Sequence, residues 1–192
     1  MEKRFYLVIA LQGAGKSSAT EVLKKLLNAS SHRYSDPVRE FADDIGLPQE
    51  RKPMQDIAQA MRRQFGADCL ERLLIQRGER DAAEDVIFDG AREPKDVGNL
   101  VKHPSFHAIH IDLPELARFR RISKREQAEG RPVPTWEQFL QAENHVNERS
   151  IRDTLALIGN QRPDRLHIVD NSRTPDELRR RLEDLVSYLR GR

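Results

Sequence analysis

The chain has 192 residues, enough for one domain with a full core. Its 33 basic and 31 acidic residues give a formal net charge of +2, and only 6% of its residues are aromatic. This composition argues against nucleic-acid binding by bulk charge or by base stacking, and the single cysteine, Cys69, excludes an internal disulfide.

The chain reads as one continuous domain over residues 1–192. It carries no internal repeat or low-complexity tract, no apolar run approaches the length of a membrane span, and the first residues turn polar too soon for a signal peptide. The lone cysteine fits a reducing compartment. We therefore expect a cytoplasmic protein with no membrane or nucleic-acid partner, acting as a monomer or a homodimer.

The first predicted element is a strand over Phe5–Leu11, an apolar run of β-prone residues. A turn follows that ends in Gly-Lys-Ser, and apolar residues then recur at helical spacing over Gly15–Leu27. Strand, turn and helix in this order are the context of a phosphate-binding P-loop. In such a loop Lys16 reaches the β- and γ-phosphates and Ser17 offers its hydroxyl to Mg²⁺.

The glycines of this turn have a physical role. Gly13 and Gly15 let the backbone turn so that several N–H groups point into one concavity, where the helix N-terminus adds partial positive charge. The pattern G-x-x-x-x-G-K-[ST] departs at Ala10, which holds the place of the first glycine and can replace it if its φ is negative. The alternative, a chance Gly-Lys-Ser at a helix start, is disfavoured by the flanking strand and helix.

The next part of the chain is predicted to be mostly helical. In chain order we expect a short strand near His32–Tyr34, a helix that begins at Asp36 and ends at 46–48, and helices over Pro53–Phe65 and Asp68–Glu79. Asp36 can cap the first of these helices with Pro37 at its first position, and Gly66 stops the second. Cys69 is expected to be a small buried residue of the third.

The remaining strands alternate with helices. We expect strands at Val86–Phe88, Ala108–Leu113 and Leu166–Val169, helix from Pro94, a helix from Pro114 to about Arg125, a loop over Gln127–Pro134, a helix start at Thr135, and a closing helix that a capping box opens at Thr174–Glu177. That closing helix keeps Leu178, Leu182 and Leu189 on one side. The alternation predicts an α/β fold with a parallel sheet covered on both faces.

Three groups of charged residues could carry chemistry. Asp89 ends a buried strand, where a carboxylate can hold Mg²⁺, although a solvated Asp-Gly turn would look the same. Asp36 and Arg39 follow another strand, and Arg92 follows Asp89. The two arginines could grip a second phosphate, or could form ordinary surface ion pairs, for instance Arg39 with a neighbouring carboxylate.

The third group is a basic cluster that enters the Gly/Pro loop, made of Arg118, Arg120, Arg121, Lys124, Arg125 and Arg131. A lid here could close over the transferring phosphoryl group and exclude water, and Arg121 and Arg125 are spaced so that they point the same way. A solvated basic helix face balanced by Glu126 and Glu129 is the alternative. The six histidines lack metal-ligand spacing.

Segments spread over nearly the whole chain resemble one family, the P-loop nucleoside monophosphate kinases. Closest are the deoxynucleoside monophosphate kinases of phage type and the dephospho-CoA-kinase-like proteins of the adenylate kinase group. The segments that carry the resemblance are 12–18 (Gln-Gly-Ala-Gly-Lys-Ser-Ser), 35–40 (Ser-Asp-Pro-Val-Arg-Glu), 89–92 (Asp-Gly-Ala-Arg), 114–125 and 168–172, with looser matches at 54–57, 65–68 and Arg72. Ala10 and the short spacing of Asp89–Arg92 depart from the adenylate kinase pattern.

The resemblance implies a P-loop NTPase three-layer sandwich with a five-stranded parallel sheet and a small lid. It implies ATP and Mg²⁺ as cofactors, acceptor-binding helices at about 36–80 and a lid at about 118–147. The implied donor-binding residues are Gly13, Ala14, Gly15, Lys16, Ser17 and Ser18, with Ser17 and Asp89 at the metal. The implied acceptor residues are Asp36, Arg39, Gln55, Arg72 and Arg92, of which resemblance alone singles out Gln55 and Arg72. The implied catalytic residues are Lys16, Arg92, Arg121 and Arg125.

Three functions stay open from the sequence. The first is an ATP-dependent phosphotransferase that moves the γ-phosphoryl group of Mg·ATP to a (deoxy)nucleoside monophosphate, a small-molecule acceptor. This reaction needs no general base, since the acceptor phosphate is already anionic. The second is a dephospho-CoA-kinase-like hydroxyl kinase, with Asp36 as the candidate base. The third is a non-catalytic nucleotide-binding module.

Overall fold

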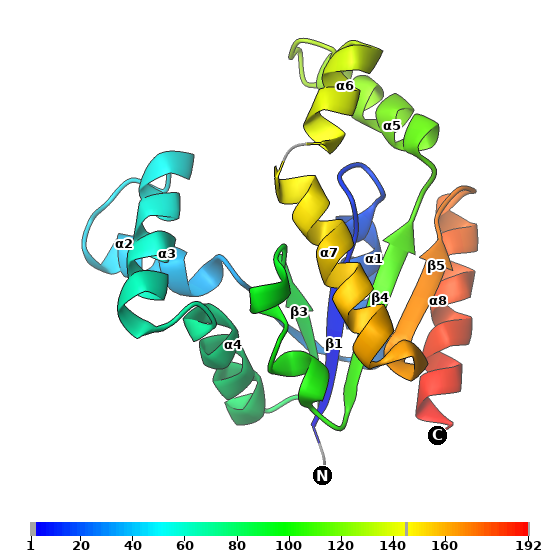
Figure 1. Cartoon of the computed structure of the whole chain (residues 1–192). Coiled ribbons are helices and arrows are strands. Elements are labelled where there is room, and N and C mark those ends of the chain that lie inside the picture. The colour runs from blue at the N-terminus through cyan, green and yellow to red at the C-terminus, as the bar shows by residue number, and fades with distance from the viewer. Residues whose placement is uncertain (1–2, 145, 192) are drawn as a thin grey trace.

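The computed structural model describes residues 3–144 and 146–191, which are built around one sheet (Figure 1). Its strands are β1 (Arg4–Ile9), β2 (Ser30–Arg33), β3 (Asp85–Asp89), β4 (Phe106–Asp112) and β5 (Leu166–Asp170). They lie in the order β2-β3-β1-β4-β5, and every pair is parallel. The expected α/β class with a five-stranded parallel sheet is confirmed.

Helices connect the strands. They are α1 (Lys16–Leu27), α2 (Asp36–Asp44), α3 (Arg51–Phe65), α4 (Cys69–Arg80), α5 (Glu115–Ala128), α6 (Trp136–Glu143), α7 (Val146–Gln161) and α8 (Pro175–Arg190), with short 3₁₀ turns at Pro94–Asp96, Leu100–Lys102 and Pro163–Arg165. Among the described residues, none of the helices is both long and apolar enough to cross a membrane.

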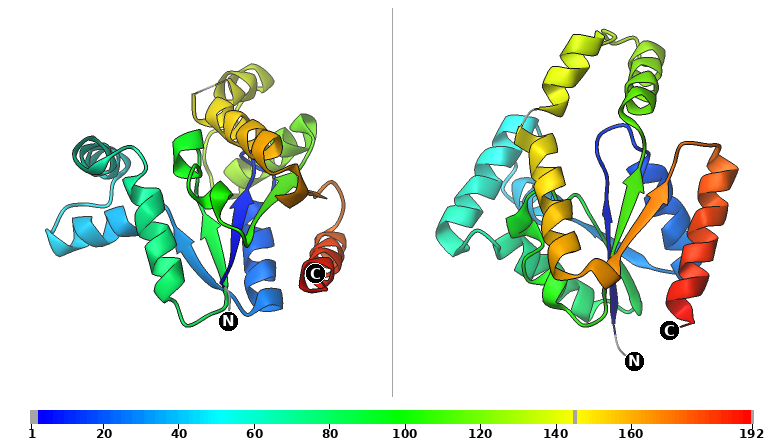
Figure 2. Two further views of the ribbon diagram at one scale, coloured as in Figure 1. Left: turned by 60° about the horizontal axis from the view of Figure 1, so that its bottom comes forward. Right: turned by 45° about the vertical axis from the view of Figure 1, so that its right-hand side comes forward.

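The sheet separates two hydrophobic cores, because successive residues of β1 point to opposite faces. Phe5, Leu7 and Ile9 pack against α4, α7 and the 3₁₀ turns, whereas Tyr6 and Val8 pack against α1 and α8. Figure 2 shows α1 and α8 together on one side of the sheet and α7 on the other. The result is a three-layer sandwich with the apolar strands buried on both faces.

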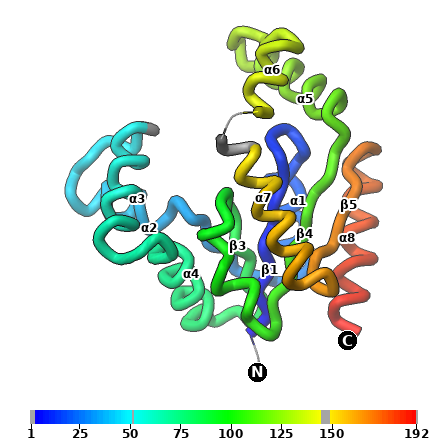
Figure 3. The backbone as a smooth tube through the Cα atoms, in the orientation of Figure 1, coloured from blue at the N-terminus to red at the C-terminus, as the bar shows by residue number. Residues whose placement is uncertain are grey.

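Two helical arms extend beyond the sandwich, as the backbone tube shows (Figure 3). The α2–α3 arm lies beyond β2 and β3, and the α5–α6 arm lies beyond the carboxyl ends of the strands. The P-loop, which follows β1, lies between them. The arms therefore bring polar residues far apart in sequence to the same edge of the sheet.

The structure corrects the sequence prediction in three places. Asp36 is the first residue of α2 rather than its cap, a position that Ser35 takes. The helix expected from Pro94 is a single 3₁₀ turn, closed by a reciprocal capping box between Glu93 and Asp96. The third difference is α7, which the prediction left unassigned, although Ile151 and Ile158 are buried at helical spacing.

A histidine pair lies at the amino-terminal ends of β4 and β5, away from the P-loop. His107 is buried, with Nδ1 3.1 Å from Nε2 of His167. Nη1 of Arg165 lies 3.0 Å from Nε2 of His107 and can only donate, so His107 is neutral with its proton on Nδ1. Burial, and then the charge of Arg165, lower the pKa of His107 to about 4.

This lowered pKa predicts an acid-sensitive contribution to stability. In the unfolded chain His107 gains its proton near pH 6.5, whereas in the folded chain it stays neutral down to about pH 4. The stabilisation is therefore complete above pH 6.5 and is lost as the pH falls from 6.5 to 4, amounting to about 3 kcal/mol. Urea unfolding gives the free energy of unfolding at pH 7 and at pH 4.5. The decrease between the two pH values should be smaller in His107→Gln than in wild type. Equal losses in the two proteins would contradict it.

Candidate functional site

The P-loop of the structure requires both of its glycines. Gly13 and Gly15 have φ values of +82° and +95°, in the left-handed region that side chains disfavour. A Cβ atom at Gly15 would lie 2.3 Å from Nδ2 of Asn171, and one at Gly13 would lie 3.0 Å from the carbonyl oxygen of Arg118. Both the backbone conformation and the surrounding atoms therefore exclude a side chain at these positions.

Ala10 does not have a positive φ, so an alanine can stand where the P-loop pattern has its first glycine. Among the described non-glycine residues, only Asn28 has a positive φ, so Ala10 lies in the region open to any L-residue. Ala10 is buried at the end of β1, where it packs with the α1 side of the core and borders the cleft described below. A methyl group is accommodated where the usual pattern has glycine.

Lys16 and Asp89 lie in direct contact. Lys16 begins α1, and its Nζ donates a hydrogen bond to Oδ1 of Asp89 at the end of β3. Asp89 is buried, pairs in register with Val8, and has its second carboxylate oxygen 4.0 Å from Nε of Arg33. The structure thus places a carboxylate beside the P-loop lysine, where a strand end meets the start of a helix.

An open cleft of about 1350 Å³ joins the P-loop to the two arms. Ten residues from the expected site line it, namely Gly13, Gly15, Lys16, Ser17, Ser18, Arg39, Gln55, Arg92, Arg121 and Arg125. Four others do not, namely Ala14, Asp36, Arg72 and Asp89. The tertiary structure therefore gathers residues from the P-loop, α2, α3, the segment after β3, and α5.

The four residues outside the lining have other contacts. Ala14 is buried, and Asp89 is bonded to Lys16. Asp36 accepts a hydrogen bond from the backbone N–H of Arg33 at 2.7 Å, so its carboxylate is used at the turn that opens α2. Arg72, near the start of α4, donates to the carbonyl of Phe65 at the end of α3 and pairs with Asp68.

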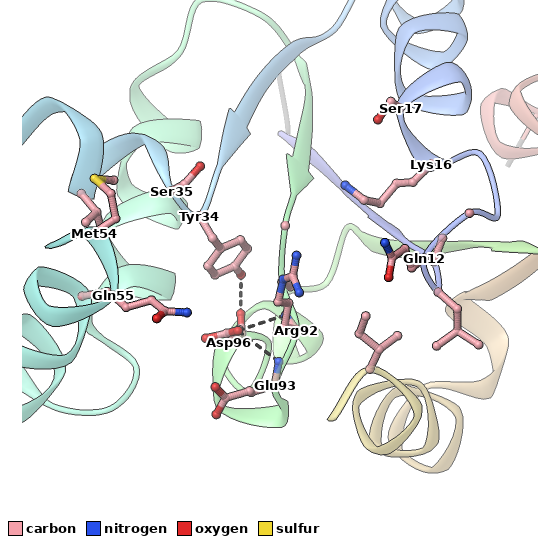
Figure 4. Close-up of a pocket in the computed structure, with 18 of the residues that line it drawn as sticks. Gln12, Lys16, Ser17, Tyr34, Ser35, Met54, Gln55, Arg92, Glu93 and Asp96 are labelled. Atoms are coloured by element: carbon pink, nitrogen blue, oxygen red, sulfur yellow. Dashed lines mark hydrogen bonds between the residues drawn. The ribbon is translucent and has the colours of Figure 1, made fainter. Parts of the chain in front are cut away.

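Asp96 organises the wall of the cleft opposite the P-loop (Figure 4). One of its carboxylate oxygens accepts the backbone N–H groups of Arg92 and Glu93 at 3.0 and 3.1 Å, and the other lies 3.1 Å from Nη2 of Arg62. Its backbone carbonyl accepts the hydroxyl of Tyr34, and burial raises the pKa of Tyr34 well above its ordinary value, which keeps this donor protonated. The segment that carries Arg92 is thereby tied to α3 and to the end of β2.

Sequence analysis missed this group. Tyr34 follows β2, Arg62 lies in α3, and Asp96 lies in the 3₁₀ turn after β3, so the three are far apart in sequence. The reciprocal capping box of Glu93 and Asp96 was the one local signal for it. In Figure 4, Arg92 lies between this group and Lys16, and Gln55 points from α3 toward the same region.

The arginines of the basic cluster differ in how deeply they are buried. Arg118 is 3% exposed and forms a double ion pair with Glu143 of α6, whose carboxylate also contacts Arg152 of α7 at 2.8 Å. Its Nε donates to the carbonyl of Leu113 at 3.1 Å. The Arg118–Glu143 pair therefore joins α5 to α6, and the contact of Glu143 with Arg152 joins α6 to α7.

The two lid arginines expected to be catalytic face the cleft instead. Arg121 donates to the backbone carbonyl of Asn171 at 2.7 Å, and its Nη1 lies 3.5 Å from that of Ala14. Arg125, which is exposed, pairs with its neighbour Glu126 at 2.7 Å. Surface ion pairs of this kind contribute little, so Arg125 is available to a ligand at small cost.

The cleft has a strong excess of positive charge. Among the described residues that line it, the cationic side chains are Lys16, Arg39, Arg62, Arg92, Arg121 and Arg125, and the carboxylates are Glu93 and Asp96. Both carboxylates already have partners, Glu93 in the capping box and beside Lys95, and Asp96 in the contacts above. The lining of the cleft is thus net positive because it holds few carboxylates, although the overall charge of the chain is nearly balanced.

The chain matches a family model and several curated proteins. A family model described as an AAA domain matches residues 7–149. Among curated proteins, a UPF0200 protein of Thermoplasma volcanium is 26% identical over 152 residues, covering 79% of this chain and 82% of its own length. A UPF0200 protein of Methanocaldococcus jannaschii is 29% identical, covering 78% and 76%.

Solved structures show the same fold at low identity. A sugar kinase from Janibacter sp. HTCC2649 has a TM-score of 0.55 at 17% identity, covering 98% of this chain and 95% of its own. The protein TT1252 from Thermus thermophilus has a TM-score of 0.60 at 15% identity, covering 98% and 99%. A shikimate kinase from Acinetobacter baumannii, in complex with shikimate, has 0.52 at 16%, covering 100% and 94%. The fold is that of the P-loop kinases.

Proposed function

The chain belongs to the AAA domain family, and from that premise we propose that it is an ATP-dependent phosphotransferase whose acceptor carries a phosphate. The reaction moves the γ-phosphoryl group of Mg·ATP to a nucleoside or deoxynucleoside monophosphate. The charge of the cleft is the observation that carries the proposal, because six cationic side chains face two carboxylates that already have partners.

The donor side is the P-loop. The N–H groups around Gly13 and Gly15 and the start of α1 suit the donor phosphates, with Lys16 at the β- and γ-phosphates and Ser18 alongside. Ser17 and Asp89 offer the hydroxyl and carboxylate oxygens that Mg²⁺ prefers, and Asp89 is buried beside Lys16 at the end of β3. These residues fit the ion, which when bound neutralises phosphate charge.

The acceptor side is the wall built on Asp96. Arg92 and Arg39 grip the acceptor phosphate, each able to form two parallel hydrogen bonds to it, and Gln55 of α3 faces the rest of the acceptor. Helices α2–α4, within residues 36–80, form the acceptor-binding part. The lid, at about residues 118–147, takes in α5 from Arg118 onward and all of α6, and residue 145 lies outside the described part of the chain.

Charge stabilisation and positioning supply the rate. Lys16, Arg92, Arg121 and Arg125 surround the transferring group with positive charge, and closure of α5–α6 excludes water. A hydroxyl acceptor would instead need a base in the cleft. Asp36, the candidate for that role, lies outside the lining and is bonded to the backbone of Arg33, which favours an acceptor that brings its own anionic oxygen.

A panel of acceptors tests the proposal. Release of ADP from Mg·ATP is measured with the nucleoside and deoxynucleoside monophosphates, with dephospho-CoA, and with neutral sugars. We expect turnover with one or more monophosphates. Turnover with dephospho-CoA or a sugar alone would replace the proposal by a hydroxyl kinase, and nucleotide binding without any transfer would leave a binding module.

Arg92→Ala refines the same assay. Loss of charge-assisted hydrogen bonds to the acceptor phosphate should lower kcat/KM for the monophosphate by about 10²-fold, with the KM for ATP changed little. Arg179→Ala removes an exposed arginine of α8 whose ion pair, among the described residues, is with Glu183. This matched control should behave as wild type. An Arg92→Ala enzyme with an unchanged acceptor KM and kcat would remove Arg92 from the site.

A further inference from the structure

Asn171 lies where three parts of the molecule meet. It follows β5 and is 5% exposed, and its backbone N–H donates to the carbonyl of Asp112 at 2.8 Å, which extends the pairing of β5 with β4. Its side-chain Nδ2 donates to the backbone carbonyl of Ala14 at 2.8 Å. The backbone carbonyl of Asn171 accepts a hydrogen bond from Nη2 of Arg121 at 2.7 Å. One residue therefore joins the sheet, the P-loop and the lid helix.

The Asn171 amide also determines the space beside Gly15. A Cβ atom at Gly15 would approach Nδ2 to 2.3 Å, so the amide packs directly on the backbone of the loop. The Nδ2–Ala14 bond is buried, and a buried hydrogen bond between partners held by the fold fixes their relative orientation. The side chain is thus both packed against the loop and bonded to it.

The bond to Ala14 has a consequence for the next N–H group. In a trans peptide the carbonyl and the following N–H point in opposite directions, and the described residues contain no cis peptide. The carbonyl of Ala14, held on Asn171, therefore directs the N–H of Gly15 away from Asn171. Gly15 lines the cleft, whereas Ala14 is buried.

We propose that Asn171 is a positioning residue for the donor nucleotide. Its amide holds the Ala14–Gly15 peptide in the orientation that presents the loop N–H groups to the donor phosphates. The inference rests on the proposed function, in which the P-loop binds Mg·ATP. It concerns the donor side alone, so the acceptor site keeps its own affinity when Asn171 is changed.

Two substitutions test this role. Asn171→Ala removes the amide, and Asn171→Leu keeps the branched shape and the burial but cannot donate. The Kd for ATP, measured by isothermal titration calorimetry with Mg²⁺ present, should rise about fivefold to tenfold in both, the equivalent of one hydrogen bond. The KM for ATP should rise by the same factor, and the KM for the acceptor should stay within about twofold.

Ser172→Ala is the matched control, since Ser172 is the exposed neighbour and its hydrogen bonds, among the described residues, go to Asp170. It should bind ATP as wild type does. If Asn171→Ala does not fold, Asn171→Leu carries the test. Wild-type affinity in Asn171→Leu would show that shape alone matters, and an equal rise in both KM values would show a general structural role. Either result overturns the inference while the proposed function stands, whereas a wild-type protein that binds no ATP overturns both.

Discussion

Lys16→Ala is expected to lower kcat by about 10²–10³-fold, the effect of removing one fixed cation from a developing phosphoryl charge. In the proposed reaction Lys16 is the P-loop side chain beside the γ-phosphate, and among the described residues of α1 no other cation lines the cleft. The measurement is steady-state turnover with the best acceptor from the panel. Turnover within about threefold of wild type would exclude the proposed role of Lys16.

Controls separate this effect from a loss of structure. Lys16 pairs with Asp89, so its removal leaves a buried carboxylate without that partner, and the melting temperature of the variant has to be measured beside its activity. Lys24→Ala, on the same helix, removes a half-buried lysine whose side-chain partner among the described residues is Glu21. It should leave both turnover and melting temperature unchanged.

Glu143→Ala is expected to lower the free energy of unfolding by about 3–5 kcal/mol, since it leaves the Arg118 guanidinium buried without its charge partner. Arg118 is 3% exposed and makes its double ion pair with Glu143 beneath the α5–α6 arm. Urea unfolding monitored by circular dichroism gives the value. The same change should also make the α5–α6 arm more mobile. Arg118 would keep its bond to the carbonyl of Leu113 but lose its bonds to α6.

Two further variants distinguish the buried Arg118–Glu143 ion pair from the outer Glu143–Arg152 pair. Arg152→Ala removes the outer partner of Glu143. Because the Arg152 side chain is 42% exposed, this change should lower the free energy of unfolding by about 1 kcal/mol or less. The double variant Arg118→Met with Glu143→Leu should recover much of the loss, since apolar side chains of similar size replace the pair. If Glu143→Ala costs no more than Arg152→Ala, the buried pair does not hold the arm.

The parts that sequence predicted well are those whose cause is local. The P-loop is a short strand, two glycines and a helix start, and each has a signature within a few residues of the chain. The capping threonines Thr135 and Thr174 lie where expected, each accepting the N–H group three residues on. The parallel sheet follows from alternating strands and helices, since parallel strands need a crossover connection.

The site itself was predicted unevenly. Resemblance and spacing pointed to Lys16, Arg39, Arg92, Arg121 and Arg125, all of which line the cleft. Arg72 was grouped with the acceptor residues on a loose match, and it lies exposed near the start of α4, paired with Asp68. Which face of a helix meets a cleft depends on how that helix packs, and residue spacing within one helix does not contain that information.

By itself, the sequence determined the sheet, the phosphate-binding loop and the position of Lys16 at the start of α1, because backbone conformation and helix capping depend on neighbouring residues. The tertiary structure decided the rest. It buried Arg118 while leaving Arg121 at the cleft, and it placed Asn171 against Ala14, 157 positions away in the chain. Such partners are chosen by the packing of elements on the sheet, which brings together residues that no local pattern connects.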